Sequence, residues 1–326
     1  IKINKVSSKT EDMRTNLMLF IIPVLLTLIS CQQSSIISVK SPGEKVVATV
    51  DLSDNQLKLS VSKNGNVVLA NCSLGLLVDS VDIGKGVSLA NKVEQKTINE
   101  EYPLHGNHSK AINHCQEIVV PLKHQELNYQ LLVRAYDDGV AVRYIIPDAK
   151  NKTINADNTA FHLPDSVQCF WADYADSNEE LHKVSKFRDI PENHAIAAPI
   201  TVNAGSNYLA FSEAECIDFP DMSWIKQNGA IKANFTTNPN GWKNQKDTIV
   251  SPWRSVILAD NLTQLVNSDL ITNLCKPPLS GTDFSWAKPG RVLWQWWSVG
   301  APQFADQKQW YDAAARLTWE YYLVDD

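Results

Sequence analysis

The sequence lacks a basic excess, and this shortage excludes several classes of protein. Its 326 residues include 30 Lys plus Arg and 36 Asp plus Glu, a net charge of −6. Nucleic-acid-binding proteins usually carry a basic balance or a Lys/Arg stripe. This chain has neither, so a nucleic-acid partner is excluded. Apolar residues make up 44% and charged residues 20%, which is typical of globular proteins and excludes a disordered chain. At about 100–200 residues per domain, the length predicts about two domains.

Cysteine is sparse and has no metal-type spacing. The chain has six cysteines, with neither a C-x-x-C pair nor the Cys/His spacing of a zinc site. If Cys31 is set aside as a site of lipid attachment, the remaining number is odd, and at least one thiol has no disulfide partner within the chain. We expect buried free thiols. The five remaining residues are Cys72, Cys115, Cys169, Cys216 and Cys275.

No apolar run is long enough to cross a bilayer, which needs about 20 residues. The longest run, Leu17–Ile29, follows Met13 and Arg14, and a positive start before a short apolar stretch is typical of a secretory signal. The run ends in Leu28-Ile29-Ser30-Cys31, which resembles a bacterial lipobox. We therefore assign residues 1–35 to upstream sequence and a signal peptide (Met13–Cys31). We expect export to the periplasm or cell surface with a membrane lipid anchor on Cys31. The alternative is an uncleaved anchor helix.

From Val46 to about Cys275 the pattern is that of strands and turns. Apolar residues alternate with polar ones before the hairpin signal Asn64-Gly65, and again on both sides of Asp138-Gly139. Many short strands with turns between them predict a large antiparallel β-sandwich. We assign this domain to residues 36–278.

After Pro277-Pro278 the pattern changes. Residues 291–299 predict a buried strand, residues 306–317 a helix and residues 321–324 a second buried strand. Strand, helix and strand in succession are typical of a parallel sheet or barrel. One such unit cannot bury its own faces, so we expect the N-terminal portion of a longer protein. Residues 279–326 are then a linker and the start of a catalytic (β/α)8 barrel.

Five short motifs follow one another in a fixed order between residues 40 and 326. They are Asn113-His114 with Glu117, Trp171 with Asn178-Glu179, Ser212-Glu213-Ala214, Pro252-Trp253-Arg254, and Trp294–Trp297. This ordered series resembles glycoside hydrolase family 97, a family of exported α-glucosidases and α-galactosidases. Ile112 departs from the family pattern, which has Arg at that position.

The resemblance implies a galactose-mutarotase-like super-β-sandwich followed by a (β/α)8 barrel that cleaves α-linked oligosaccharides with the help of Ca²⁺. It also implies that one Ca²⁺ ligand is a Glu of the sandwich. Glu179 is the preferred candidate because it lies in a polar segment after aromatic residues, and Glu213 is the alternative. Either residue can instead be a solvated surface carboxylate. The catalytic carboxylates are expected beyond residue 326, so this part alone is expected to be inactive.

Four residues are candidates for contact with substrate. His114 is the candidate in the sandwich, although a lone His on a strand is more often structural. Trp297 is expected on the first barrel strand, where it either stacks on a sugar or packs in the core. Asp325 and Asp326 end the second strand on the face where barrels bind substrate, but they can equally cap a helix.

Two readings from other classes stay open. A carbohydrate-binding or structural lipoprotein would use the sandwich alone and would have no use for residues 306–326. A mutarotase-type sugar epimerase would also use a large β-sandwich and a His, but it leaves the βα unit unexplained. The sequence does not distinguish glucosides from galactosides, or retention from inversion.

Overall fold

A computed structural model describes residues 35–301 and 303–325 of the chain. Cys31 and Asp326, two of the predicted site residues, lie outside these ranges. Contacts divide the chain into two compact units between Ile271 and Thr272, and each unit is described by itself. No helix in the described ranges is both long and apolar enough to cross a membrane.

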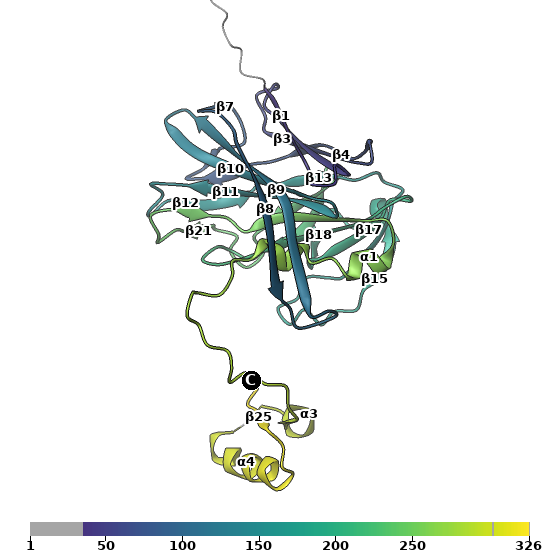
Figure 1. The fold of residues 1–326 in the computed structure, drawn as a ribbon, viewed down its shortest axis with the longest axis vertical. Coiled ribbons are helices and arrows are strands. Elements are labelled where there is room, and N and C mark those ends of the chain that lie inside the picture. Colours follow the sequence, from purple (N-terminus) through teal and green to yellow (C-terminus); the bar gives the residue numbers. More distant parts are fainter. Residues whose placement is uncertain (1–34, 302, 326) are drawn as a thin grey trace, which may run out of the picture. The chain divides into compact units, whose positions relative to one another are not determined.

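The first unit is a sandwich of antiparallel sheets (Figure 1). Its first sheet has eight strands within the described residues, in the order β1-β2-β3-β4-β13-β20-β19-β16. These are β1 (Ile36–Lys40), β2 (Val46–Asp51), β3 (Lys58–Lys63), β4 (Asn66–Ser73), β13 (Ala160–His162), β20 (Ala230–Asn234), β19 (Ser223–Gln227) and β16 (Ala195–Ile196). The predicted hairpin at Asn64-Gly65 joins β3 to β4. Both turn residues have positive φ, 50° and 81°, as tight hairpin turns require.

The second sheet has eleven strands among the described residues, with the central order β14-β17-β18-β23-β11-β10-β9. Its members are β7 (Val87–Leu89), β8 (Glu94–Pro103), β9 (Lys110–His124), β10 (Leu127–Tyr136), β11 (Gly139–Ile146), β14 (Gln168–Trp171), β15 (Lys183–Lys186), β17 (Ile200–Asn203), β18 (Tyr208–Ala214), β22 (Ile249–Val250) and β23 (Trp253–Ala259). Strands β8 and β9 form a long hairpin that extends past the body of the sandwich (Figure 1).

Smaller elements complete the first unit. A four-stranded sheet of described residues, in the order β21-β12-β5-β6, flanks the sandwich. It consists of β21 (Trp242–Lys243), β12 (Thr153–Asp157), β5 (Leu76–Val78) and β6 (Val81–Asp82). The 3-10 turn η1 (Phe187–Asp189) follows β15, and the short helix α1 (Leu262–Val266) follows β23. Helix α2 (Leu270–Leu274) crosses the division between the units. The strand pattern did not predict these two helices.

The predicted hairpin at Asp138-Gly139 is present, but its turn lies one residue earlier. Tyr136 pairs with Gly139, so Asp137 and Asp138 form the turn and Gly139 begins β11. A Cβ on Gly139 would lie 2.3 Å from the Leu270 side chain and 2.5 Å from the Val256 carbonyl oxygen. This glycine therefore serves the close approach of α2 rather than the turn.

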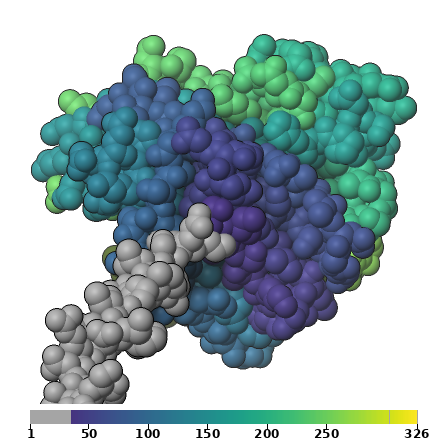
Figure 2. Space-filling model, turned by 90° about the horizontal axis from the view of Figure 1, so that it is seen from above, coloured from purple at the N-terminus to yellow at the C-terminus, as the bar shows by residue number. Residues whose placement is uncertain are grey.

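The hydrophobic core lies between the two large sheets. Phe161 of the first sheet meets Phe211 of the second, with ring centroids 5.0 Å apart, and Trp224 packs edge-on against Phe161 at 5.8 Å. The Trp224 indole N–H donates to the Phe211 carbonyl across the sheets, at 3.2 Å. In Figure 2 the purple surface near the N-terminal end of the described chain lies beside the blue surface of the residues that follow in the sequence. Each sheet buries the face that it turns toward the other, and this explains why apolar and polar residues alternate along the strands.

The second unit contains a strand-helix-strand arrangement. It comprises β24 (Val292–Trp294), α3 (Trp296–Val299), η2 (Phe304–Asp306), α4 (Gln307–Arg316) and β25 (Tyr321–Leu323). Strands β24 and β25 pair in parallel, with Val292 opposite Tyr321 and Trp294 opposite Leu323. The predicted helix and second strand are thus present within about a residue or two.

The predicted strand at residues 291–299 is wrong beyond Trp294. Trp296 and Trp297 lie in helix α3. The helix begins here because the backbone carbonyl oxygen of Gln295 accepts the backbone N–H groups of Ser298 and Val299. Tyr322 donates to the Gln295 side chain at 3.1 Å and holds it in place. The two strands were also expected to be buried, yet Val292 is 45% and Leu323 45% exposed.

Candidate functional site

A buried carboxylate links the long hairpin to the sheet. Glu117 of β9 is 2% exposed and accepts from Arg134 Nε at 2.7 Å and from Lys96 Nζ at 2.9 Å. Burial by itself raises the pKa of Glu117, but the hydrogen bonds and charges of Lys96 and Arg134 outweigh it, and the net pKa is lowered. Glu117 is therefore held as a carboxylate between two cations.

Two guanidinium groups lie beside one buried indole. The centres of the Arg134 and Arg143 guanidiniums are each 4.7 Å from the ring centroid of Trp253, which is 1% exposed. Arg143 also donates from Nη1 to Glu215 at 2.5 Å and from Nη2 to the Ser251 carbonyl at 2.7 Å. Cation–π contacts strengthen when desolvated, so this group ties β10, β11 and β23 together.

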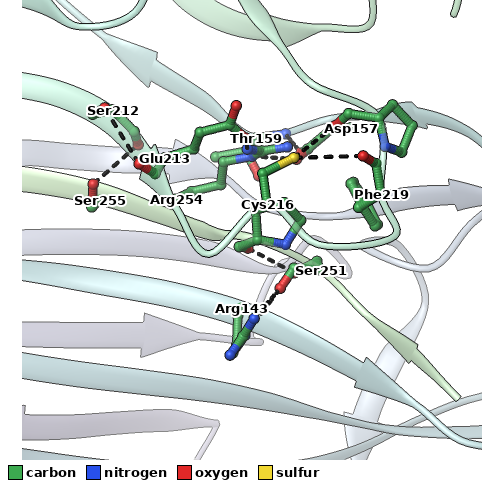
Figure 3. Close-up of polar contacts among 12 residues, drawn as sticks. Arg143, Asp157, Thr159, Ser212, Glu213, Cys216, Phe219, Ser251, Arg254 and Ser255 are labelled. Atoms are coloured by element: carbon green, nitrogen blue, oxygen red, sulfur yellow. Dashed lines mark hydrogen bonds and ion pairs between the residues drawn. The ribbon is translucent and has the colours of Figure 1, made fainter. Parts of the chain in front are cut away.

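A third arginine joins strands from inside the sandwich. Arg254 Nε lies 2.7 Å from Asp157 Oδ2 and its Nη1 lies 2.5 Å from Glu213 Oε2. Figure 3 shows the three side chains converging from β23, β12 and β18. Burial lowers the pKa of Arg254, but the two carboxylates outweigh it and the net pKa is raised. Glu213, a predicted metal ligand, is thus engaged in an ion pair.

Glu179 lies in a different setting. It is exposed in the loop between β14 and β15, where its backbone N–H donates to Ser177 Oγ at 3.4 Å. Nearby, Asp173 accepts from Lys183 at 2.5 Å and lies 2.6 Å from His194 Nε2, and hydrogen bonds from both lower the pKa of Asp173. Within the part of the chain that the structure describes, no group of three His, Cys, Asp or Glu side chains could hold a metal ion.

His114 lies exposed on β9, opposite Asn99 of β8. Its neighbour Asn113 is buried, at 6% exposed. Asn113 donates to Glu100 at 3.1 Å and accepts from the Tyr136 hydroxyl at 3.2 Å. The sequence analysis included Asn113 in a family-like motif but gave a site role to the histidine alone.

The remaining candidates lie in the second unit. Trp297 is 84% exposed on α3, and its ring centroid is 5.4 Å from that of Trp294. The Trp294 indole N–H donates to Asp325 Oδ2 at 2.8 Å. Two of the predicted residues, Trp297 and Asp325, are therefore brought together through Trp294, for which no binding role had been predicted.

Five cysteines lie within the described residues. Cys72, Cys115 and Cys169 are buried, Cys216 and Cys275 are exposed, and these five described cysteines form no disulfides. Burial raises the pKa of Cys72 to about 11 and that of Cys169 to about 12, so these thiols are poor nucleophiles.

A known family matches most of the chain. A model described as "Glycosyl-hydrolase 97 N-terminal" matches residues 39–277. Among curated proteins, a "Probable retaining alpha-galactosidase" of Streptomyces bingchenggensis is 26% identical over 294 residues, 87% of this chain and 45% of the relative. A "Retaining alpha-galactosidase" of Bacteroides thetaiotaomicron is 20% identical over 355 residues, 94% of this chain and 52% of the relative. The chain thus spans about half the length of these relatives.

Solved structures support the fold. A Glycoside Hydrolase Family 97 enzyme from Pseudoalteromonas sp. strain K8 superposes with a TM-score of 0.77 at 24% identity, over 89% of this chain and 47% of that one. The same enzyme has been solved with acarbose and with panose. A β-arabinopyranosidase superposes with a TM-score of 0.73 at 22% identity, over 89% of this chain and 50% of that one. At these identities the likeness concerns the fold alone.

Proposed function

The chain belongs to glycosyl hydrolase family 97, and we propose that it is the N-terminal part of an exported, calcium-dependent α-glycoside hydrolase. The observation that carries the proposal is the parallel pair β24–β25 with α4 between them, directly after a sandwich that matches the family's N-terminal domain. A binding module has no use for such a unit, whereas a (β/α)8 barrel begins with one.

The catalytic carboxyl groups are proposed to lie beyond residue 326. Glycoside hydrolysis needs two carboxyls flanking the scissile bond, and in retaining enzymes they are about 5–5.5 Å apart. The carboxylates of Glu117, Glu213 and Glu215 do not suit this role, because each is paired with an arginine. The sandwich is therefore a scaffold, and this part alone is expected to be inactive.

The proposed substrates are α-galactosides first and α-glucosides second. Both curated relatives are named retaining α-galactosidases, which favours galactosides and retention. The K8 enzyme was solved with acarbose and panose, which keeps α-linked glucose oligosaccharides as the second candidate.

Glu179 is the proposed sandwich ligand for Ca²⁺. Calcium binds six to eight oxygens, and the exposed Glu179 carboxylate suits a site shared with another part of the protein. Glu213 suits it less well, because Arg254 already binds its carboxylate. In the full-length protein, Glu179→Gln is expected to weaken Ca²⁺ binding and activity together while the fold is kept, with Glu180→Gln as the matched control. Unchanged Ca²⁺ dependence would move the assignment to Glu213 or end it.

A lipid anchor on Cys31 is proposed to hold the mature protein at the membrane. The support is the lipobox-like sequence Leu28-Ile29-Ser30-Cys31 after a short apolar run. Labelled fatty acid incorporated into the wild type but not into Cys31→Ala would support the anchor. Equal labelling would end this part of the proposal.

The decisive experiment uses the complete reading frame from Gln32 onward. Nitrophenyl α-galactoside and α-glucoside are assayed with Ca²⁺ and with a chelator. Chelator-sensitive hydrolysis of either one supports the proposal and identifies the sugar. Sugar binding without hydrolysis would favour the carbohydrate-binding lipoprotein instead.

A further inference from the structure

The loop that carries Glu179 is held closed at its base by an ion pair. The backbone pairing of β14 with β15 ends where Trp171 lies opposite Lys183, and residues 172–182 connect the two strands. Asp173 lies just inside this loop, and its Oδ2 accepts from Lys183 Nζ at 2.5 Å. The second residue of the loop is thus bound to the first residue that follows the loop.

Asp173 is itself fixed by other contacts. Its backbone pairs with Ile196 in an isolated antiparallel bridge. The backbone N–H of the next residue, Tyr174, donates to the Ala195 carbonyl oxygen at 3.0 Å. His194 Nε2 lies 2.6 Å from the carboxylate oxygen Oδ1, which Lys183 leaves free. Asp173 therefore gives Lys183 a partner that does not move with the loop.

The first arm of the loop, which leads up to Glu179, has its own supports. The Tyr174 hydroxyl donates to Asp221 Oδ2 at 2.7 Å, which joins this loop to the connection between β18 and β19. The Asn178 backbone N–H donates to the Ala175 carbonyl oxygen at 3.0 Å, and Asn178 has a φ of 55°. A turn therefore comes directly before Glu179.

The second arm of the loop has fewer supports. Residues 180–182 are exposed, and within the described part of the chain they make no hydrogen bond or ion pair. The next contacts come at Lys183, whose Nζ also lies 4.8 Å from the ring centroid of Trp171. Strand β15 is an edge strand, and the ends of exposed elements open most easily. The Asp173–Lys183 pair therefore holds the end of β15 from which this arm departs.

This support matters because the Glu179 carboxylate has no other task. Among the described residues it makes no ion pair or hydrogen bond, whereas Glu213 and Glu215 are each paired with an arginine. A carboxylate on a rigid loop binds Ca²⁺ more tightly than one on a flexible loop, because less chain entropy is lost on binding. We propose that Asp173, through its ion pair with Lys183, is the residue that positions Glu179 for Ca²⁺. The inference rests on the proposed function, which makes Glu179 the Ca²⁺ ligand of the sandwich.

The test uses the full-length protein and two variants that remove opposite charges. Asp173→Ala removes the carboxylate, and Lys183→Met removes the ammonium while an apolar side chain still covers Trp171. Calorimetric titration is expected to show a Kd for Ca²⁺ raised about tenfold in Asp173→Ala, the lower end for losing a residue that orients a metal ligand. A smaller rise is expected in Lys183→Met, because His194 still contacts Asp173. At saturating Ca²⁺ both variants are expected to regain the kcat of the wild type.

A second readout needs neither Ca²⁺ nor activity. With a chelator present, the amides of β15 are expected to exchange hydrogen about fivefold faster in Lys183→Met than in the wild type, the scale of one exposed ion pair. Lys183→Arg keeps the charge and is expected to restore both the exchange rate and the Ca²⁺ affinity. Lys152→Met is the matched control, because Lys152 pairs with Asp79 at 3.1 Å while 34% exposed, and it is expected to change neither readout.

Three outcomes would overturn the positioning role and leave the proposed function standing. The first is a Kd for Ca²⁺ within about twofold of the wild type in both variants, while Glu179→Gln weakens Ca²⁺ binding. The second is weaker binding in Asp173→Ala with tighter binding in Lys183→Met, since net charge alone would then explain both. The third is failure of both variants to fold, which would make the ion pair a part of the sandwich's stability.

Two further outcomes separate this inference from the proposed function. If the wild type binds Ca²⁺ in a way that depends on Asp173 and Glu179 but hydrolyses neither nitrophenyl glycoside, the positioning role stands and the proposed function fails. If Glu179→Gln leaves Ca²⁺ binding unchanged in an active enzyme, Glu179 is not the ligand. The positioning role of Asp173 is then overturned, whereas the assignment as a hydrolase stands.

Discussion

The two units of the chain differ in how they cover their apolar side chains. In the described part of the sandwich, Trp224, Trp253 and Phe161 are each less than 2% exposed. In the second unit Trp297 is 84% and Phe304 is 96% exposed. A stable fold must bury one face of each layer against another. The sandwich meets this requirement with its own strands, whereas a two-stranded parallel sheet with one helix does not.

The ion pairs of the two units differ in burial as well. Arg254 and Asp157 are each 1% exposed in the sandwich, and their pairing joins separate strands. In the second unit, Arg291 and Glu320 are paired at 2.8 Å but remain 58% and 45% exposed. Removing one partner of a buried pair leaves a charge without compensation, whereas water replaces a lost partner at an exposed site.

The largest expected effect comes from separating the units. Residues 35–277 expressed alone are expected to unfold in one cooperative denaturant transition, because the core between the two sheets is complete within them. Residues 278–326 alone are expected to give no cooperative transition, because their strands lack a covering layer. Circular dichroism and hydrogen exchange would measure both.

Two outcomes would contradict this predicted difference in stability between the units. A cooperative transition in residues 278–326, with protected amides on β24 and β25, would show that the βα unit is stable without further strands. Loss of cooperativity in residues 35–277 would show that the sandwich depends on the second unit for its stability.

The second expected effect comes from Arg254. Arg254→Ala leaves Asp157 and Glu213 without their shared cation inside the sandwich, and removing one partner of a buried pair costs about 3–5 kcal/mol of unfolding free energy. Urea denaturation of the sandwich at pH 7 would measure the loss.

Arg188→Ala in the sandwich is the matched control, since it removes an exposed arginine whose Nε lies 3.8 Å from one carboxylate oxygen, that of Asp189. A much smaller loss is expected there. Equal losses for the two variants would mean that burial does not set the strength of these pairs, and the contrast between the units would then rest on apolar packing alone.

Some strands of the two units could be predicted from the sequence and others could not, for physical reasons. Strands with one buried face alternate visibly, so the hairpins β3–β4 and β10–β11 were predicted from the pattern. The predicted strand at residues 291–299 was wrong beyond Trp294, because aromatic density indicates burial rather than strand geometry. The turn begins where the Gln295 carbonyl oxygen accepts backbone N–H groups.

The ion pairs of Arg254 inside the sandwich were harder to predict from the sequence. Arg254 lies on a strand with the buried Val256 and Leu258, and an arginine in phase with core residues is a signal for a buried ion pair. Its partners Asp157 and Glu213 are 97 and 41 residues away in sequence, and no local pattern connects them. The Pro252-Trp253-Arg254 motif that indicated the family thus marks residues of the scaffold.

The smallest expected effect concerns Glu117 and pH. Its folded pKa is lowered, because Lys96 and Arg134 outweigh burial. The stabilisation is therefore complete above the ordinary glutamate pKa of about 4.3 and is lost as pH falls toward the lower folded value. Glu117→Gln is expected to destabilise the sandwich at pH 7, by less than Arg254→Ala, because its amide oxygen can still accept from Arg134.

The difference in unfolding free energy between wild type and Glu117→Gln is expected to shrink below about pH 4.3. Glu101→Gln is the matched control on the same hairpin, since Glu101 pairs with Lys110 while 58% exposed, and its effect is expected to be small at every pH. Urea midpoints from pH 7 to pH 3 would measure both series. If the difference in unfolding free energy between wild type and Glu117→Gln stays constant over that range, the carboxylate charge contributes nothing. Packing of the Glu117 side chain alone would then stabilise the hairpin β8–β9 against the sheet.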